Sequence, residues 1–390
     1  MSPRLSGLSP AALMVAALAG CGRADARGAD RPPPPGAEVV RNGETGAWGE
    51  GAGWRLSEEL RIGGQADGAG PGVFGRVIAF DADPLGRVWV ADVLASEIRV
   101  FGADGRYVRT VGRRGAGPGE FTQISGMAFA PDGRLWVLDG GASRFTVLDT
   151  TGAVVATHAR QGGGAMTPWP GGFDREGRLY DALLMGAPDG TVAQAVVRYT
   201  ADFAPLDTLR IPPFEGEYFE RERDRVNVPF TGLPFWSLDA SGDLWMGVTD
   251  RYRLFRTTMA GDTVRVVEKE QAPVPVTDED VRWMTQVYAD FIRRGGRFTR
   301  SRIPATKPPV YGAFPGDDGT LWVVPARGLR DPVVFDVFDP AGRYLGRVKP
   351  DAPVALTPAP VIRRGYLYGI VRDDQGVESV ARLRIEKLSS

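Results

Sequence analysis

Basic side chains that could bind an anion gather in a few short segments of the chain. Arginine and lysine recognise carboxylate and phosphate groups through charge-assisted hydrogen bonds. Clustered cations can create a local positive potential even though the net charge is only −1. The candidates are Arg113, Arg114, Arg293, Arg294, Arg297, Lys307, Arg327 and Arg330. Acidic residues are frequent in residues 215–224, and pairing with them is an equally good explanation of these basic residues.

Aromatic and oxygen-bearing side chains offer a second kind of chemistry. The aromatic candidates for the mouth of a channel are Trp169, Trp236 and Tyr311. Glu120 and Gln123, together with Asn227, could supply the oxygen ligands that calcium prefers. Asn227 is one of only two asparagines in the chain. This scarcity disfavours a calcium site built with amide ligands, so no cofactor is expected and calcium stays the one candidate.

Residue counts exclude several catalytic chemistries. His158 is the only histidine, which argues against a serine–histidine–aspartate triad and against a multi-histidine metal site. Cys21 is the only cysteine, so the chain has no disulfide and no haem-attachment motif. No phosphate-binding glycine motif follows a predicted strand, and the near-neutral charge predicts no nucleic-acid partner. The sequence therefore favours binding over catalysis.

A repeat that recurs six times positions these residues. Each copy contains a glycine, any residue, an apolar residue and an aromatic residue, preceded by an apolar segment. The six aromatic residues are Trp89, Trp136, Tyr180, Trp245, Trp322 and Tyr368. Tight turns and short strands at this spacing predict an all-β fold, a six-bladed β-propeller. The recurring aromatic ring is predicted to pack between neighbouring blades.

The two ends of the chain are predicted to close the ring. Residues 54–62 are strand-like, whereas the last blade, residues 360–388, contains only three predicted strands. Pairing residues 54–62 with this blade would complete it and remove both open sheet edges. Residues 54–388 are therefore predicted to form one propeller domain, which we expect to be monomeric.

Two insertions mark one face of the predicted propeller. Residues 211–234 and 272–310 lengthen links between blades, while the turns within blades are short. Function is usually carried on loops over a rigid scaffold, so this loop-rich face is the predicted binding face. Residues 277–296 within the second insertion predict a helix, with Thr277 as its N-cap. Its apolar stripe is expected to dock on the propeller as a lid or, alternatively, to grip a partner.

The N-terminal region carries an export signal and a linker. Residues 1–21 contain an early arginine, a short apolar run and the sequence Leu18-Ala19-Gly20-Cys21, which is typical of a secretory signal. The last four residues resemble the bacterial lipoprotein cleavage box. Cys21 would then carry the lipid, the only membrane contact, and Gly22 by resemblance favours an outer membrane. Residues 22–53 are expected to be a disordered tether. The alternative is a plain secretory signal.

The first two predicted blades resemble the NHL repeat. Residues 115–149 read GAGPGEFTQISGMAFAPDGRLWVLDGGASRFTVLD, which is similar to the NHL pattern of GPGEF, an inner strand, DxxGxIYVAD and RIQVFD. The resemblance extends over about residues 62–158 and weakens beyond them. It implies a propeller that binds proteins, RNA or small ligands and that is only sometimes an enzyme. It also implies that Asp92, Asp139 and Arg144 hold the loop between strands.

These observations predict a lipid-anchored, extracytoplasmic propeller of the bacterial envelope. We expect its loop-rich face to bind an envelope protein, an anionic small molecule or a glycan. The alternative is a calcium-dependent hydrolase or lyase, because lactonase-like six-bladed propellers hold such a metal with Glu, Asn and Asp. A purely structural envelope component is a third possibility. The amidating-lyase propellers that resemble NHL rings use several zinc-binding histidines, which this chain lacks.

Overall fold

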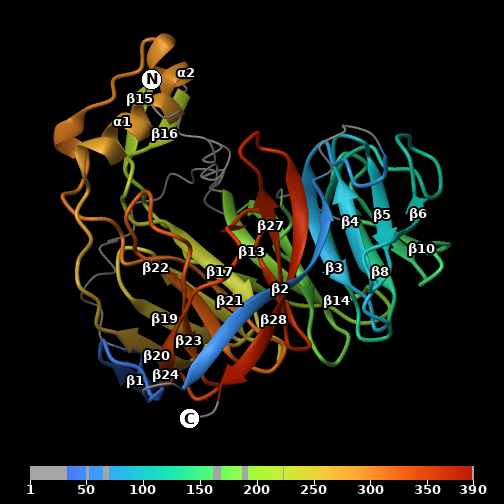
Figure 1. Cartoon of the computed structure of the whole chain (residues 1–390), viewed down its shortest axis with the longest axis horizontal. Helices are drawn as coiled ribbons and strands as arrows, with labels where there is room; N and C mark the ends of the chain where they lie inside the picture. Colours follow the sequence, from blue (N-terminus) through green and yellow to red (C-terminus); the bar gives the residue numbers. More distant parts are fainter. Residues whose placement is uncertain are drawn as a thin grey trace.

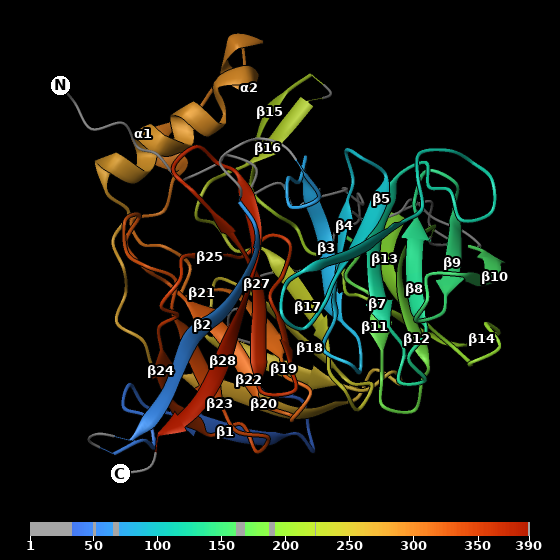
Figure 2. The ribbon, with the colours of Figure 1, turned by 45° about the vertical axis from the view of Figure 1, so that its right-hand side comes forward.

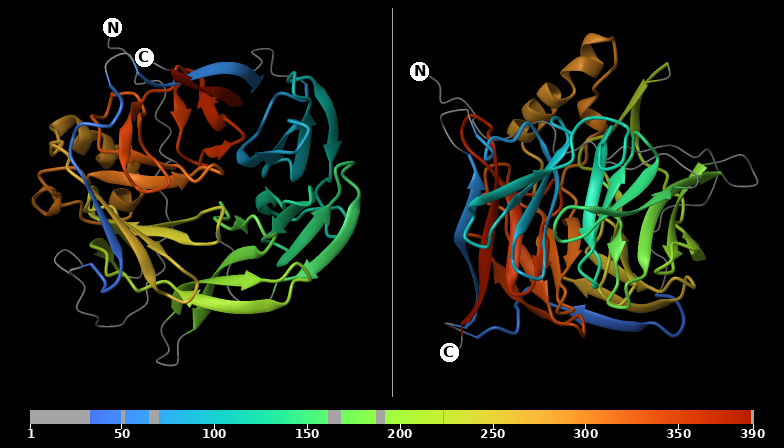
Figure 3. Two further views of the ribbon diagram at one scale, coloured as in Figure 1. Left: turned by 90° about the horizontal axis from the view of Figure 1, so that it is seen from below. Right: turned by 90° about the vertical axis from the view of Figure 1, so that its right-hand side faces the viewer.

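The computed structural model of the chain describes residues 33–49, 52–64, 70–160, 168–186, 192–222 and 224–388. In these residues, six sheets of four or five strands stand around a ring (Figures 1 and 3). The chain is therefore an all-β, six-bladed propeller with one helical insertion, as the repeat predicts. The predicted signal sequence, residues 1–21, lies outside the described residues.

The first five blades follow one another along the chain, and each runs from an inner to an outer strand. Blade one comprises β3 (Val77–Ala82), β4 (Val88–Asp92), β5 (Glu97–Phe101) and β6 (Tyr107–Val111). Blade two comprises β7 (Ile124–Phe129), β8 (Leu135–Asp139), β9 (Arg144–Leu148) and β10 (Val154–Ala159). Blade three comprises β11 (Gly172–Phe173), β12 (Leu179–Gly186), β13 (Val192–Tyr199) and β14 (Pro205–Arg210).

The second half of the ring contains the insertions and the closure. Blade four comprises β17 (Pro234–Leu238), β18 (Leu244–Val248), β19 (Arg253–Thr257) and β20 (Thr263–Lys269). Blade five comprises β21 (Val310–Pro315), β22 (Leu321–Pro325), β23 (Phe335–Phe338) and β24 (Tyr344–Val348). Blade six comprises β25 (Val354–Ala355), β26 (Val361–Arg363), β27 (Tyr366–Arg372), β28 (Glu378–Leu388) and β2 (Gly53–Gly63).

The repeated glycine turn is fixed by an aspartate. In blade one, Asp83 accepts hydrogen bonds from the backbone N–H groups of Leu85 and Arg87, both at 2.9 Å. Gly86 in this turn has φ +76°, which favours glycine. Trp89 follows, fully buried, and its indole N–H donates to the Asp83 carboxylate at 3.2 Å. The recurring aromatic side chain therefore packs in the core, as predicted.

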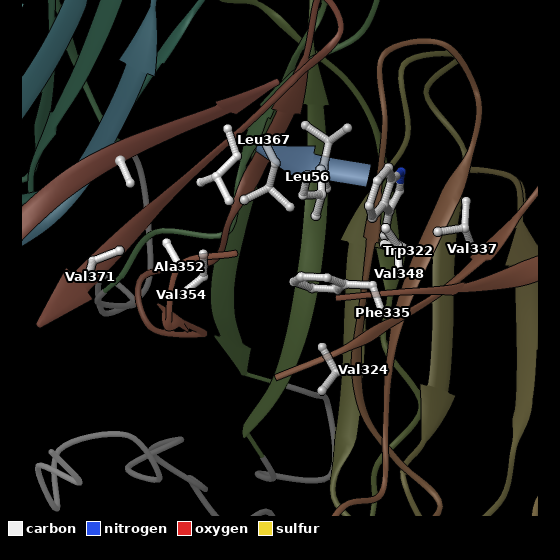
Figure 4. Close-up of a cluster of buried hydrophobic side chains, with 13 residues drawn as sticks. Leu56, Trp322, Val324, Phe335, Val337, Val348, Ala352, Val354, Leu367 and Val371 are labelled. Atoms are coloured by element: carbon white, nitrogen blue, oxygen red, sulfur yellow. The ribbon is translucent and has the colours of Figure 1, made fainter. Parts of the chain in front are cut away.

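Ring closure joins the two ends of the chain. Strand β2 pairs antiparallel with β28, from Gly53 opposite Leu388 to Gly63 opposite Ser379. Leu56 of β2 is fully buried and packs with Trp322 and Phe335 of blade five and with residues of blade six (Figure 4). The predicted strand of residues 54–62 therefore completes the last blade.

The prediction of a disordered tether is wrong for the described residues between 33 and 49. Strand β1 (Glu38–Asn42) pairs in parallel with β20 and adds a fifth strand to blade four. Asn42 then donates to the carbonyls of Glu268 and Gly342, both at 3.1 Å, and so joins blade four to blade five. Composition did not reveal this strand, because EVVRN has only two apolar residues and is ordered by pairing with the open sheet edge of β20. Residues 22–32 lie outside the described residues.

Truncating the closing strand should destabilise the whole ring. We expect Leu56→Ala to lower the free energy of unfolding by about 2 to 5 kcal/mol, because it removes a fully buried side chain and leaves a cavity. Leu85→Ala is the matched control, since that side chain is 71% exposed and should change stability little. Equilibrium denaturant unfolding measures both. Equal stabilities of the two variants would contradict the closure role of Leu56.

Candidate functional site

The two insertions fold together into a single cap on the loop-rich face. The first contributes the hairpin of β15 (Tyr218–Arg221) and β16 (Asp224–Asn227). The second contributes α1 (Asp278–Val287), α2 (Ala289–Arg293) and a short 3-10 turn, Arg300–Arg302. The cap lies on the opposite side of the ring from β1 (Figures 1, 2 and 3). Its hydrophobic core draws on both insertions and contains Phe219, Val228, Val276, Phe291 and Ile303.

The apolar stripe of the helical segment is used inside the cap. Phe291 is buried in the cap core and Val281 packs against it, next to residues of the β15–β16 hairpin. The predicted N-cap is present, because Thr277 and Asp280 form a capping box in which each side chain accepts from the other's backbone N–H. These two members of the stripe therefore pack with the other insertion, a partner that the sequence did not predict. The contact between the two insertions is visible only in the folded structure, because residues 211–234 are far from the helix in the sequence.

A buried ion pair within the second insertion lies where the cap meets blade five. The Lys307 ammonium lies 2.7 Å from the Asp280 carboxylate, and both side chains are almost fully buried. Lys307 also donates to the carbonyl oxygen of Arg327 at 3.1 Å, which ties the cap to the loop after β22. At the surface, Arg330 donates to the Glu279 carboxylate at 2.9 Å. Lys307 and Arg330, whose binding of a partner stays a prediction, each form an ion pair with a residue of the cap.

The ion pair sets the titration of Asp280. Burial alone would raise the pKa of this carboxyl group, but the Lys307 ammonium and the hydrogen bonds from Thr277 outweigh burial and lower the pKa. Asp280 is therefore ionised at neutral pH. An ionised carboxylate in this position depends on Lys307, because a buried charge without a partner is costly.

A hollow of about 350 Å³ lies at the junction of the cap and blade five. Its lining includes the apolar side chains Val274 and Leu329. Charged groups complete the lining and largely neutralise one another, namely Glu279, Asp280, Lys307, Arg330 and Asp331. The hollow has the volume of a small-ligand site. Four of its charged residues form two ion pairs without a ligand, and the Asp331 carboxylate accepts a hydrogen bond from the backbone N–H of Gly328.

Tyr311 and Arg327 lie near this junction, at the ends of β21 and β22. Burial raises the pKa of Tyr311 to about 12, with the Arg327 charge acting in the opposite direction. Burial also lowers the pKa of Arg327. The guanidinium donates to the carbonyl of Asp331 at 2.6 Å, while its buried Nε has no hydrogen-bond partner among the described residues. Of the predicted candidates, Lys307, Tyr311, Arg327 and Arg330 are thus gathered in one region.

The candidates before blade two lie in one loop, which is held by its own residues and by blades one and two. Arg113 donates to the Glu120 carboxylate at 2.9 Å, and Glu120 also accepts from the backbone N–H of Gly117 at 2.9 Å. The Gly117 N–H and then Arg113 lower the pKa of Glu120. Arg114 donates to the carbonyl of Leu94 at 2.8 Å. The backbone N–H of Gln123 donates to Asp139, which holds the loop as the repeat implies.

Two predicted aromatic candidates belong to the packing between blades. Trp169 is only 6% exposed and lies in the core between blades two and three. Its indole N–H donates to Asp181 at 2.9 Å. Trp236 of β17 is half-buried and packs against another core cluster. An aromatic residue beside an inner strand can belong either to the core between blades or to the mouth of the channel. The sequence around Trp169 does not distinguish these two roles.

Arg293, Arg294 and Arg297 lie at the far end of the cap. Arg293 pairs with Asp290 of the same helix, and Arg294 lies 2.9 Å from Asp224 of the hairpin. Arg297 is exposed. The basic residues therefore form three groups: the loop before blade two, the junction and the cap end. The single basic bowl that the sequence suggested is divided among them, because each group folds with its own acidic residues.

The candidate calcium ligands come from different parts of the structure. Glu120 precedes β7 and is engaged by Arg113, whereas Asn227 ends β16 in the cap. Among the described residues, no three or more His, Cys, Asp or Glu side chains are grouped so that they could hold a metal ion.

One buried charge network, between blades four and five, was not predicted from the sequence. Asp336 of β23 accepts hydrogen bonds from the hydroxyls of Tyr252 and Tyr344 and from Arg347, at 2.8 to 3.1 Å. The Lys269 ammonium lies 3.6 Å away, and burial lowers its pKa. A hollow of about 290 Å³ adjoins Tyr252 and Lys269. The only signal was a charged residue inside the apolar segment FDVF, and the contacts indicate a structural link between blades four and five.

Comparison with known proteins agrees with the fold. A family model, DUF5128, which describes a 6-bladed β-propeller, matches residues 81–158. No curated protein matches the sequence. A Bacteroides fragilis protein described as exported shares 12% identity, with a TM-score of 0.52 over 90% of this chain and 100% of that chain. A DUF4221 member from Bacteroides vulgatus shares 10% identity, with a TM-score of 0.50 over 86% and 99%. A Xanthomonas campestris gluconolactonase has 13% identity and a TM-score of 0.42 over 86% and 98%. At these identities the likeness to the two Bacteroides proteins shows the fold alone.

Removing Lys307 should loosen the cap while the propeller stays folded. We expect Lys307→Met to destabilise the cap locally by about 3 to 5 kcal/mol, because Asp280 would be left as a buried charge without its partner. Amide hydrogen exchange in α1 measures this loss. The double variant Lys307→Met with Asp280→Asn should recover part of it, since the unpaired charge is gone. Unchanged exchange in the single variant would contradict the fastening role.

Proposed function

We propose that this chain is an extracytoplasmic, monomeric binding protein, held to the bacterial envelope by a lipid on Cys21, whose loop-rich face binds a partner through the cap. The observation that carries the proposal is the cap itself. Two insertions separated by blade four fold against each other around one core. A propeller needs neither insertion to close its ring, because the other links between blades are shorter than these two.

The location rests on the N-terminal sequence and on the likeness to an exported protein. Leu18-Ala19-Gly20-Cys21 resembles a lipoprotein cleavage box and follows a short apolar run. A protein described as exported shares the fold over 90% of this chain. No helix in the described part of the chain is long and apolar enough to cross a membrane.

Candidate side chains at the junction and before blade two are already engaged in structural contacts, which favours recognition by the cap over catalysis. The polar groups at the junction are engaged in structural pairs, such as Lys307 with Asp280. The carboxylate considered for calcium, Glu120, is engaged by Arg113. The exposed surface of the cap carries charged residues that are available to another molecule, and an envelope protein or an anionic ligand fits this surface.

Replacing the lipid-accepting cysteine should release the protein from the membrane. We expect Cys21→Ser to move the protein from the membrane fraction to the soluble extracytoplasmic fraction, because a serine cannot carry the thioether-linked lipid. Cell fractionation followed by immunoblotting measures the shift. The matched control is Ser9→Cys, which leaves Cys21 in place and should remain with the membrane. Retention of the Cys21→Ser variant would exclude the lipid anchor.

Removing the cap should abolish partner binding. The chain is already hydrogen-bonded across the base of each insertion, from Val228 to Glu217 and from Val276 to Ala305. Residues 218–227 and 277–304 can therefore each be replaced by an Asn-Gly turn. We expect cross-linking in envelope extracts to give an adduct with the intact protein and none with the capless protein.

The control for cap removal alters the opposite, plain face. Arg106 and Arg134 lie in its short turns, and their side chains are 89% and 59% exposed. Arg106→Glu with Arg134→Glu should leave the adduct unchanged. An adduct that persists without the cap would move the binding surface elsewhere on the propeller, provided that the capless ring unfolds with normal cooperativity.

A further inference from the structure

The far end of the cap is a strongly basic segment. Residues 293–302 read RRGGRFTRSR and contain five arginines and no acidic residue. They begin at the last residue of α2 and include the 3-10 turn Arg300–Arg302. We call the five arginines of this segment the cap tip. Local structure explains only its beginning, because Arg293 and Arg294 stand at the C-terminal end of α2, where cations are favourable.

The carboxylates near the cap tip neutralise only two of its arginines. Asp290 pairs with Arg293, and Asp224 pairs with Arg294. The remaining three arginines have no carboxylate within salt-bridge distance among the described residues. The cap tip therefore keeps about three uncompensated positive charges, and the exposed side chains hold them in solvent.

The three uncompensated arginines differ in how firmly they are held. Arg302 donates to the carbonyl of Tyr218 at 2.8 Å and lies over the ring of Phe219, so it also supports the cap. Arg300 makes a weak contact with the carbonyl of Ile303 at 3.4 Å. Arg297 makes no hydrogen bond within the described chain. Arg297 and Arg300 are therefore the two side chains most available to another molecule.

Phe298 separates these two side chains and fixes the segment. Its ring lies 5.2 Å from Phe219 and 5.8 Å from Tyr288 and packs against the cap core. The backbone between Arg297 and Arg300 is thus attached to the cap, while both guanidinium groups are exposed. A preformed backbone lowers the entropy cost of binding.

We propose that the cap tip binds a carboxylate-rich segment of a partner protein. This inference rests on the proposed function and names the chemistry of its partner. Arginine forms forked, bidentate hydrogen bonds with carboxylates, and the cap tip repeats arginine over a short distance, so it fits a chain of Asp and Glu side chains. The interaction is electrostatic, exposed and sensitive to salt.

A membrane surface fits the cap tip less well than a protein does. None of the exposed large hydrophobic side chains of the described chain lies on the cap, so nothing there would enter a bilayer. The cap also lies on the side of the ring opposite β1, the described strand nearest the N-terminus (Figures 1 and 2). A protein held at its N-terminus would accordingly present the cap tip away from its own membrane.

The test measures binding of an acidic peptide to the full chain carrying Cys21→Ser. The probe is a fluorescent peptide of alternating glutamate and glycine, and its glutamine counterpart is the peptide control. We expect the acidic peptide to bind, the glutamine peptide not to bind, and affinity to fall as ionic strength rises. Arg297→Glu with Arg300→Glu should weaken binding by about tenfold or more, measured by fluorescence anisotropy.

Matched variants distinguish the effect of charge on binding from the effects of guanidinium geometry and of unfolding. Arg106→Glu with Arg134→Glu makes the same charge change on the plain face and should stay within about twofold of the parent affinity. Arg297→Lys with Arg300→Lys keeps the charge and loses the fork, so it should lie between the parent and the reversal variant. All variants should have the same thermal unfolding temperature, because the substituted arginine side chains are exposed.

Two results of these binding measurements would overturn the proposal. One is a folded Arg297→Glu, Arg300→Glu variant that binds the acidic peptide as tightly as the parent chain. The other is binding to phosphatidylglycerol vesicles that the reversal variant loses, without binding of the acidic peptide, since this would assign the cap tip to a membrane. A cross-linked adduct that needs the cap and survives the reversal would leave the proposed function standing and remove the cap tip from it.

Discussion

The antiparallel pairing of β2 with β28 is the interaction on which the rest of this structure depends. A propeller blade exposes sheet edges unless its strands are complete, and only a closed ring shields the blade interfaces from solvent. Here the closing strand also supplies Leu56 to the core between blades five and six. The blades then hold one another in place through buried aromatic side chains such as Trp89 and Trp322. Every loop on the ring is therefore carried by a scaffold in which β2 and β28, from opposite ends of the propeller, belong to one sheet.

The rigid ring explains how a cap can be made from distant segments. Residues 211–234 and 272–310 leave the same face on either side of blade four, so their ends are fixed relative to each other before they fold. The hairpin and the helices then share a core, and Lys307, paired with Asp280, links the second insertion to blade five through the carbonyl of Arg327. The cap behaves as a part of the propeller with one exposed, basic end. Its shape and charge, more than any cluster of catalytic groups, distinguish this face.

Sequence predicted the features that repeat, and missed those that depend on contacts between distant residues. Glycine in the turn after Asp83 and the aromatic residue after it recur because each blade needs them, so six blades and the closing strand could be predicted. Strand β1 was missed because its partner edge on β20 is visible only in three dimensions. The pairing of Arg294 with Asp224 and the contact of Lys307 with the loop of Arg327 are of the same kind. Candidate basic residues were found by composition, but their division into three groups required the fold.

The N-terminal arm has a mechanical consequence. Before the chain reaches β2, it pairs with blade four through β1, is held by Asn42, and is hydrogen-bonded to β24 at Ala47 and Trp48. Tension applied at the start of the chain meets these attachments in series, so β1 must detach before the load reaches the closing strand. The attachments of this N-terminal segment therefore protect the β2–β28 pairing from a pulling force applied at the N-terminus.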